Sequence, residues 1–248
     1  MVKRIRKEIE ETKVLLRCVP PLVLVFVVVS FVLMNLLANK SLAGLPEWLA
    51  LDAGTLVSWI AFMSMDVLVK RFGPKAATKI SVIGVLFNLF VCSVFFVCSK
   101  VPGYWGESFA YQGQASDIVN LSLNNTFGGT WYVLFGSTVA ILVSAVVNNS
   151  LNFSIGKMFK KNPNSFMAYA CRSYISTTIG QFVDNLVFAL IVSVNFFGWT
   201  MQQAVMCALT GALVECVFEI VFSPIGFRIV KRWDDENVGK EYLDYIGE

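Results

Sequence analysis

Residues 19–38 read VPPLVLVFVVVSFVLMNLLA, and the interval between Arg17 and Lys40 contains no charged side chain. A helix needs about 20 apolar residues to cross the roughly 30 Å hydrocarbon core of a bilayer. A second uncharged stretch of this length lies between Lys79 and Lys100. Both stretches predict membrane-spanning helices, and they decide the fold class.

Four further stretches are expected to cross the membrane: residues 50–69, 131–155, 167–195 and 201–228. Each is long and apolar enough to span, although some carry acidic or basic side chains. We therefore predict an all-α, polytopic membrane protein with six transmembrane helices.

The composition agrees with this class. Of 248 residues, 56% are hydrophobic and only 15% are charged, whereas soluble domains are about 25% charged. The chain has no histidine, which excludes His-ligated metal sites and Ser-His-Asp catalysis. There is also no glycine-rich phosphate loop. We expect no enzyme activity, no catalytic residues, no metal and no cofactor. The net charge of +3 is too small to indicate nucleic-acid binding.

Lysine and arginine predict the orientation. They gather before the first expected span, in the second and fourth loops and after the last span, whereas the opposite side holds only Lys40 and Lys100. Cytoplasmic loops carry this positive excess, so both termini are expected in the cytoplasm. The expected organisation is an amphipathic cytoplasmic segment (1–17), a transmembrane domain (18–230) and a cytoplasmic tail (231–248).

The fifth expected span carries a polar stripe. Within CRSYISTTIGQFVDNLVF (171–188), Ser176, Gly180 and Asp184 follow one another along one helical face, and Thr177 and Gln181 flank it. Polar groups within a span are costly and face a cavity or a partner. The stripe is therefore expected to face other helices or water.

One ion pair is expected near the inner surface. Asp66, near the end of the second span, and Arg172, near the start of the fifth, lie at a similar depth when the spans run in opposite directions. The alternative is that Arg172 extends to the interface on its own.

Glu215 and Glu219 lie four residues apart on one face of the sixth span. Two carboxylates this close would not both ionise readily in a low dielectric, which favours a proton-coupled step or recognition of a neutral ligand. Asn148 and Asn152 of the fourth span could hold an uncharged polar ligand. For all four, the alternative is a structural bond between helices.

Two segments together resemble a known family. MDVLVKRFGPKAATK (65–79) and RSYISTTIGQFVDNLVF (172–188) are similar to segments of the queuosine precursor transporters, also called the vitamin uptake transporter (VUT) family. The family's Asp-x-x-x-Glu-x-x-Gly motif maps onto Asp66 and Gly73, with Lys70 at the Glu position. Its Arg…Ser…Gln…Asp…Phe stretch maps onto Arg172, Ser176, Gln181, Asp184 and Phe188.

The resemblance implies import of 7-deazaguanines such as 7-cyano-7-deazaguanine, 7-aminomethyl-7-deazaguanine or queuine across a bacterial inner membrane. A carboxylate accepts the adjacent N–H donors of a guanine-like edge in parallel. We expect Asp184, Glu215 or Glu219 to accept that edge, and Gln181 with Asn148 or Asn152 to bind the carbonyl or ring nitrogens. Asp66 and Arg172 would form an inner gate or ion pair.

Two mechanisms are compatible with this interpretation. The first is a secondary carrier that works alone by alternating access. The alternative is the substrate-binding membrane subunit of an ATPase-energised (ECF-type) importer. The expected partners are a nucleobase-like small molecule and the lipid bilayer, without nucleic acid, and a homo-oligomer is left open.

Overall fold

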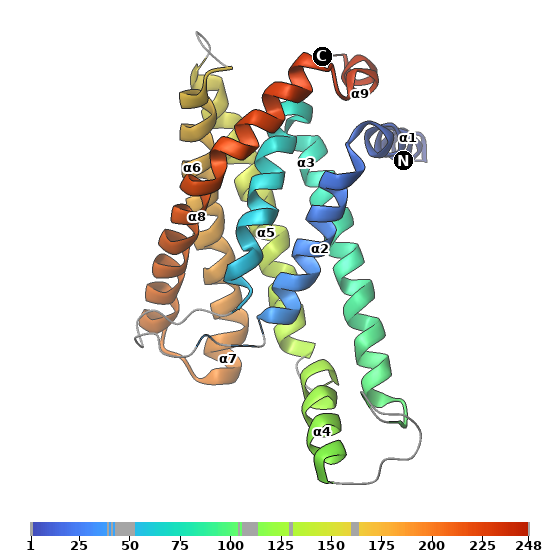
Figure 1. The fold of residues 1–248 in the computed structure, drawn as a ribbon, viewed down its shortest axis with the longest axis vertical. Helices are drawn as coiled ribbons and strands as arrows, with labels where there is room; N and C mark the ends of the chain where they lie inside the picture. The colour runs from blue at the N-terminus through green and yellow to red at the C-terminus, as the bar shows by residue number, and fades with distance from the viewer. Residues whose placement is uncertain are drawn as a thin grey trace.

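The computed structural model describes residues 2–38, 40, 42, 53–103, 105, 114–128, 131–159 and 164–247, and within them it contains helices and no strand. This confirms the all-α class. The helices are α1 (Val2–Cys18), α2 (Pro21–Leu37), α3 (Thr55–Lys100), α4 (Gln114–Gly128), α5 (Trp131–Gly156), η1 (Lys157–Phe159), α6 (Phe166–Phe188), η2 (Ala189–Ser193), α7 (Val194–Phe197), α8 (Met201–Asp235) and α9 (Lys240–Ile246). Figure 1 shows the long helices side by side, with both chain ends at one end of the bundle.

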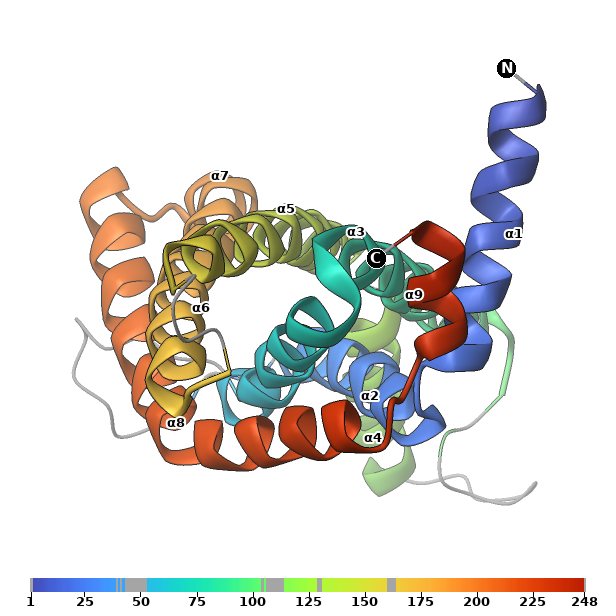
Figure 2. The same cartoon turned by 90° about the horizontal axis from the view of Figure 1, so that it is seen from above.

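α1 extends sideways from one end of the bundle (Figures 1 and 2). It meets α2 at an angle of 106°, at Pro20 and Pro21, where proline cannot continue the preceding helix but is well placed in the first turn of the next. α1 exposes Ile5 and Ile9 among its charged residues, and Figure 2 shows it projecting away from the other helices. This placement suits a helix at a membrane surface.

α3 is a helical hairpin. Gly73 has φ 82° and ψ 166°, which interrupts the helix just before Pro74, and glycine adopts this positive φ without a Cβ clash. Ser81 Oγ donates to Met65 Sδ at 3.0 Å although the two are 16 residues apart. In a straight helix that separation would be about 24 Å, so the two arms of α3 run back along each other (Figure 1).

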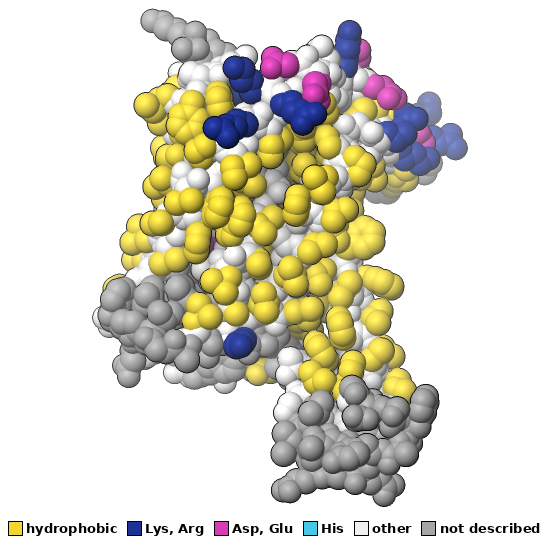
Figure 3. All heavy atoms as spheres, viewed as in Figure 1, with side chains coloured by type: hydrophobic (Ala, Val, Ile, Leu, Met, Phe, Trp, Pro, Cys, Tyr) yellow, Lys and Arg dark blue, Asp and Glu magenta, His cyan; other side chains and the backbone are white. Residues whose placement is uncertain are grey.

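Four helical segments are long and apolar enough to cross a membrane: α3, 131–159, 166–196 and α8. The bent pair α1–α2 makes a fifth candidate. In Figure 3 hydrophobic side chains cover the visible face, while most charged ones gather at the end that carries both termini. These features support a polytopic membrane protein. The count of six spans and the cytoplasmic orientation stay predictions.

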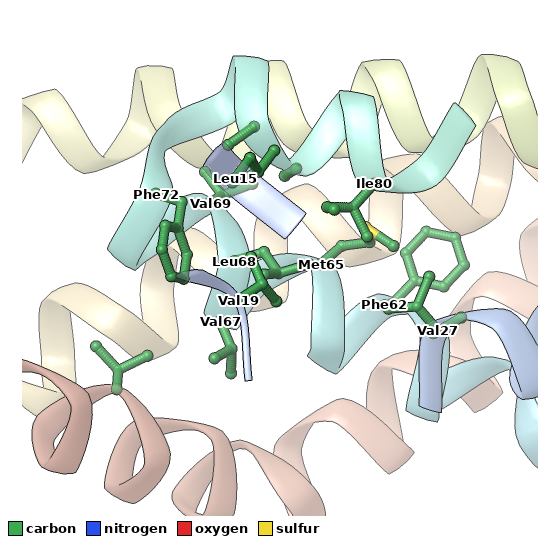
Figure 4. Packing of buried hydrophobic residues seen from close by; sticks show 14 of the residues in the cluster. Leu15, Val19, Val27, Phe62, Met65, Val67, Leu68, Val69, Phe72 and Ile80 are labelled. Carbon is green, nitrogen blue, oxygen red and sulfur yellow. The ribbon is translucent and has the colours of Figure 1, made fainter. Parts of the chain in front are cut away.

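The core gathers around the first arm of α3. Leu68 and Phe72 are almost completely buried, and Figure 4 shows them with Met65, which lies beside Ile80 of the second arm. Farther along the bundle α5 and α6 pack closely at Gly180, where an added Cβ would lie 3.0 Å from the Cβ of Asn148. This close approach brings the polar faces of the two helices together.

The hairpin turn of α3 is clamped at the end that carries the termini. Arg71 pairs with Asp234 of α8 at 2.9 Å. Lys79 contacts Glu8 and Glu11 of α1 at 2.8 and 2.9 Å. Hydrogen bonds from Lys79 and then Lys75 lower the pKa of Glu8 to about 2. These ion pairs join α1 and α8 to the hairpin turn of α3.

The long polar segment after Lys100 contains a helix, α4, that lies outside the six expected spans. α4 packs on the end of α3, with the rings of Phe95 and Phe127 stacked at 4.4 Å. Trp105 Nε1 also donates to Asn124 Oδ1 at 2.7 Å. These tertiary contacts stabilise a short helix of weak amphipathic pattern.

Candidate functional site

A buried polar network lies between α3, α5, α6 and α8. Ser165 caps α6, its side chain accepting from the Ala168 amide at 3.1 Å, and starts the helix that carries the polar stripe. Along α6, the buried polar residues are Arg172, Ser173, Ser176, Thr177 and Gln181. The stripe therefore faces other helices, as its position in an apolar span predicts.

Asp66 is the centre of this network. The carboxylate is fully buried and accepts hydrogen bonds from two neighbouring helices. From α5, Asn148 Nδ2 and Asn152 Nδ2 donate to Oδ1 at 3.2 and 2.6 Å. From α6, the Ser173 hydroxyl donates to Oδ2, and Thr177 Oγ1 lies 3.3 Å from it. Donors on both oxygens stabilise the ionised form of a carboxyl.

Arg172 reaches Asp66 through an amide. Its Nε donates to Asn152 Oδ1 at 2.7 Å, and the other end of that amide donates to Asp66. Arg172 is only 6% exposed, so its guanidinium is held inside the bundle. An added Cβ at Gly156 would lie 3.0 Å from Arg172 Nη1, so the glycine leaves room for the guanidinium.

Glu219 joins the same network from α8. It is 1% exposed, and its Oε1 lies 2.6 Å from the Ser173 hydroxyl. Its other oxygen, Oε2, has no hydrogen-bond partner among the described residues. Ser173 thus lies between two carboxyl groups, Asp66 and Glu219.

Glu215 lies one turn away on α8 and has a different partner. It is 3% exposed and accepts from Ser58 Oγ of α3 at 2.6 Å. The same two helices are also joined by the rings of Trp59 and Phe222, which stack with centroids 3.8 Å apart. The i,i+4 pair of glutamates therefore contacts two helices rather than one.

Gln181 and Asp184 lie farther along α6. Asp184 is half-buried and accepts from Ser144 Oγ of α5 at 2.8 Å. Gln181 is completely buried, and neither its Oε1 nor its Nε2 has a hydrogen-bond partner in the described structure. Buried amides without partners are rare because each lost bond costs about 1–3 kcal/mol.

The structure thus brings together five of the predicted site residues: Asp66, Asn148, Asn152, Arg172 and Glu219. Asp184 and Glu215 make contacts of their own, apart from that group. Sequence reasoning did not single out the hydroxyls that join these groups, namely Ser58, Ser144 and Ser173. Small hydroxyls are common in membrane helices, and nothing in their spacing marks these among the others.

A protein-family model described as "Putative vitamin uptake transporter" matches residues 52–229, which is most of the chain. No curated protein and no solved structure matches this chain. The match includes α3, α5, α6 and most of α8, the helices that form the polar network.

Proposed function

Because the chain belongs to the vitamin uptake transporter family, we propose that it imports queuosine precursors across a bacterial inner membrane. The substrates are 7-deazaguanines: 7-cyano-7-deazaguanine, 7-aminomethyl-7-deazaguanine or queuine. The chain works as a secondary carrier, without catalysis, and its substrate site lies among the helices.

Gln181 is the observation that carries this proposal. Its amide offers one acceptor and two donors, all buried and without a partner among the described residues. A neutral heterocycle whose carbonyl adjoins a ring N–H satisfies both ends of such an amide at once. This match favours a nucleobase-like ligand over an apolar or a fully ionised one.

Two carboxyl groups could complete the contact with a guanine-like edge. Asp184 lies three residues beyond Gln181, about one helical turn away, and is held by Ser144. Glu215 of α8 is held by Ser58 of α3. Either would accept the two parallel N–H donors of that edge.

The asparagines divide between two roles in this proposal. Asn152 uses both ends of its amide between Asp66 and Arg172, which makes it part of the inner gate. Asn148 also donates to Asp66, but its buried Oδ1 has no partner among the described residues. That oxygen supports a contact between Asn148 and the substrate.

Queuosine in tRNA provides the test in cells. Bacteria that neither synthesise nor import the precursor would express this chain alone and receive 7-cyano-7-deazaguanine at low concentration. The carrier proposal predicts restored queuosine in the wild type and loss of it in Gln181→Leu at equal membrane expression. Restoration only when energising ATPase subunits are co-expressed would instead support the ECF-type subunit. If queuosine is restored neither by this chain alone nor by this chain with the ATPase subunits, the substrate is not 7-cyano-7-deazaguanine.

A further inference from the structure

One serine hydroxyl lies between two buried carboxyl groups of different helices. Ser173 hydrogen-bonds with Asp66 of α3 and with Glu219 of α8. A serine hydroxyl carries a single proton, so it cannot donate to both carboxylates at once. Both contacts form together only when one of the carboxyl groups carries a proton and donates to Ser173.

We propose that Asp66, Ser173 and Glu219 form a proton-binding site, and that this proton is the ion coupled to substrate uptake. The coupling part of the proposal rests on the carrier function proposed above. The proton-binding part does not, because it follows from the contacts of these three residues.

The hydrogen-bond partners indicate which carboxyl carries the proton. Asp66 accepts amide donors from Asn148 and Asn152 in addition to Ser173, which stabilises a negative charge. Glu219 contacts the serine through Oε1, while its Oε2 has no partner among the described residues. The proton therefore resides on Glu219, which donates to Ser173, and Ser173 donates to the ionised Asp66.

Charge balance inside the bundle supports the same assignment. Asp66 and Glu219 are at most 1% exposed. Among the described residues of α3, α5, α6 and α8, Arg172 is the cation that faces Asp66, through Asn152. Lys70 of α3 instead donates to Asn164 Oδ1 at 3.1 Å. Ionised carboxylates in excess of this single cation would be buried charges without compensation, a state that proteins avoid by binding protons.

Asn148 connects the proton-binding site with the proposed substrate. It is completely buried, its Nδ2 donates to Asp66, and its Oδ1 has no partner in the described part of the chain. In the function proposed above that oxygen contacts the substrate. The substrate would then lie beside a carboxyl group of the proton-binding site.

Few other titratable groups surround the pair in the part of the chain that the structure describes. Arg172 and Tyr169 face it from α6, and Glu215 lies one turn before Glu219 on α8. The groups that α5 provides are the neutral amides of Asn148 and Asn152. A change of protonation at this site is therefore assigned to Asp66 and Glu219.

The position of the site suits coupling. Ser173 and Gln181 are both on α6, eight residues or about 12 Å apart. A tilt or rotation of α6 relative to α3 and α8 would change the contacts of Ser173 and of Gln181 together. Release of the proton to one side is then linked to release of the substrate.

The first test measures the proton without any substrate. The purified full-length chain is titrated with pH while infrared difference spectra record the carbonyl stretch of protonated carboxylic acids. We expect a band from a buried acid that is absent in Glu219→Gln and retained in Glu10→Gln, a surface control. Folding is checked by monodisperse elution, and Glu219→Asp, which keeps a titratable carboxyl, should retain a band. A wild type without such a band, or a band unchanged in Glu219→Gln, would overturn the proposal.

The second test measures coupling in proteoliposomes with 7-cyano-7-deazaguanine. With one proton per substrate, an inward gradient of one pH unit supports about tenfold accumulation. Glu219→Gln should abolish this accumulation while substrate exchange continues at a similar rate. Accumulation driven by sodium and insensitive to pH would overturn the coupling. A wild type that shows the infrared band but transports nothing would contradict the proposed substrate and leave the proton site standing on the first test.

Discussion

Asp66 and Arg172 are linked by the side chain of Asn152, which donates to the carboxylate at 2.6 Å and accepts from the guanidinium at 2.7 Å. The opposite charges of α3 and α6 are thus held through an amide of α5. In the gate proposed above, the three helices would separate at either end of this amide.

Replacement of Asn152 should disconnect these helices. In Asn152→Ala, Asp66 loses a donor and Arg172 loses an acceptor, each a charged buried group, so we expect destabilisation by about 1–3 kcal/mol. Thermal unfolding of the purified protein in detergent measures the loss. The matched control is Asn149→Ala, which removes a neutral contact with Thr78 of α3 and should cost less. Equal losses in the two variants would show that the charged link contributes no more than a neutral hydrogen bond.

Replacement of Gln181 should separate stability from binding. Because its amide is buried without a partner among the described residues, Gln181→Leu should leave the free energy of unfolding unchanged or raise it by about 1 kcal/mol. Substrate binding, measured by calorimetry with 7-cyano-7-deazaguanine, should be lost. Gln202→Leu, at an exposed position at the start of α8, is the control. A large destabilisation with unaltered affinity would mean that Gln181 is a structural residue.

Replacement of Gly180 should test the close packing of α5 and α6. An added Cβ lies 3.0 Å from Asn148 Cβ and 3.1 Å from Phe62 Cε1, so Gly180→Val should force the helices apart and cost about 1–3 kcal/mol. Thermal unfolding in detergent measures this cost. The control is Thr178→Val in the same helix, because the Thr178 hydroxyl bonds the backbone of its own helix at Tyr174 and the two side chains are similar in size. If Gly180→Val is as stable as the wild type, α5 and α6 do not pack as closely at Gly180 as the structure shows.

The attachment of α1 should be insensitive to mild acid. Hydrogen bonds from Lys79 and Lys75 lower the pKa of Glu8 to about 2. A carboxyl with a lowered pKa in the folded state stabilises that state above its unfolded value and loses the effect as pH falls towards the folded value. Hydrogen exchange of the α1 amides should therefore be constant from about pH 5 upward, after correction for the intrinsic rate. Loss of protection between about pH 7 and pH 5 would show that these ion pairs do not hold α1.

Much of the architecture follows from local sequence. Uncharged or nearly uncharged stretches predicted helices where α2, α5, α6 and α8 lie, and the charged second loop lies at the turn of α3. The polar stripe of α6 was correctly expected to face other helices. α4 was not predicted, because it is stabilised by tertiary contacts of Phe127 and Asn124. Such contacts produce no helical periodicity of apolar residues in the sequence.

The site was less predictable, for a physical reason. Sequence spacing places residues on a face of one helix, but it does not say which helix that face meets. Asp66 and Arg172 were expected to pair directly, and the structure links them through Asn152. For Asn152 the sequence left open a contact with the ligand or a structural bond between helices. Glu215 and Glu219 share a face, yet they contact Ser58 and Ser173 on different helices.

Uptake of labelled 7-cyano-7-deazaguanine into vesicles that contain the purified chain as the only protein tests the central claim most directly. The account predicts saturable uptake by the wild type and its loss in Gln181→Leu, with the Gln202→Leu control unaffected. Uptake equal to that of empty vesicles, with the wild-type chain folded and inserted, would contradict the claim that this chain alone carries the substrate.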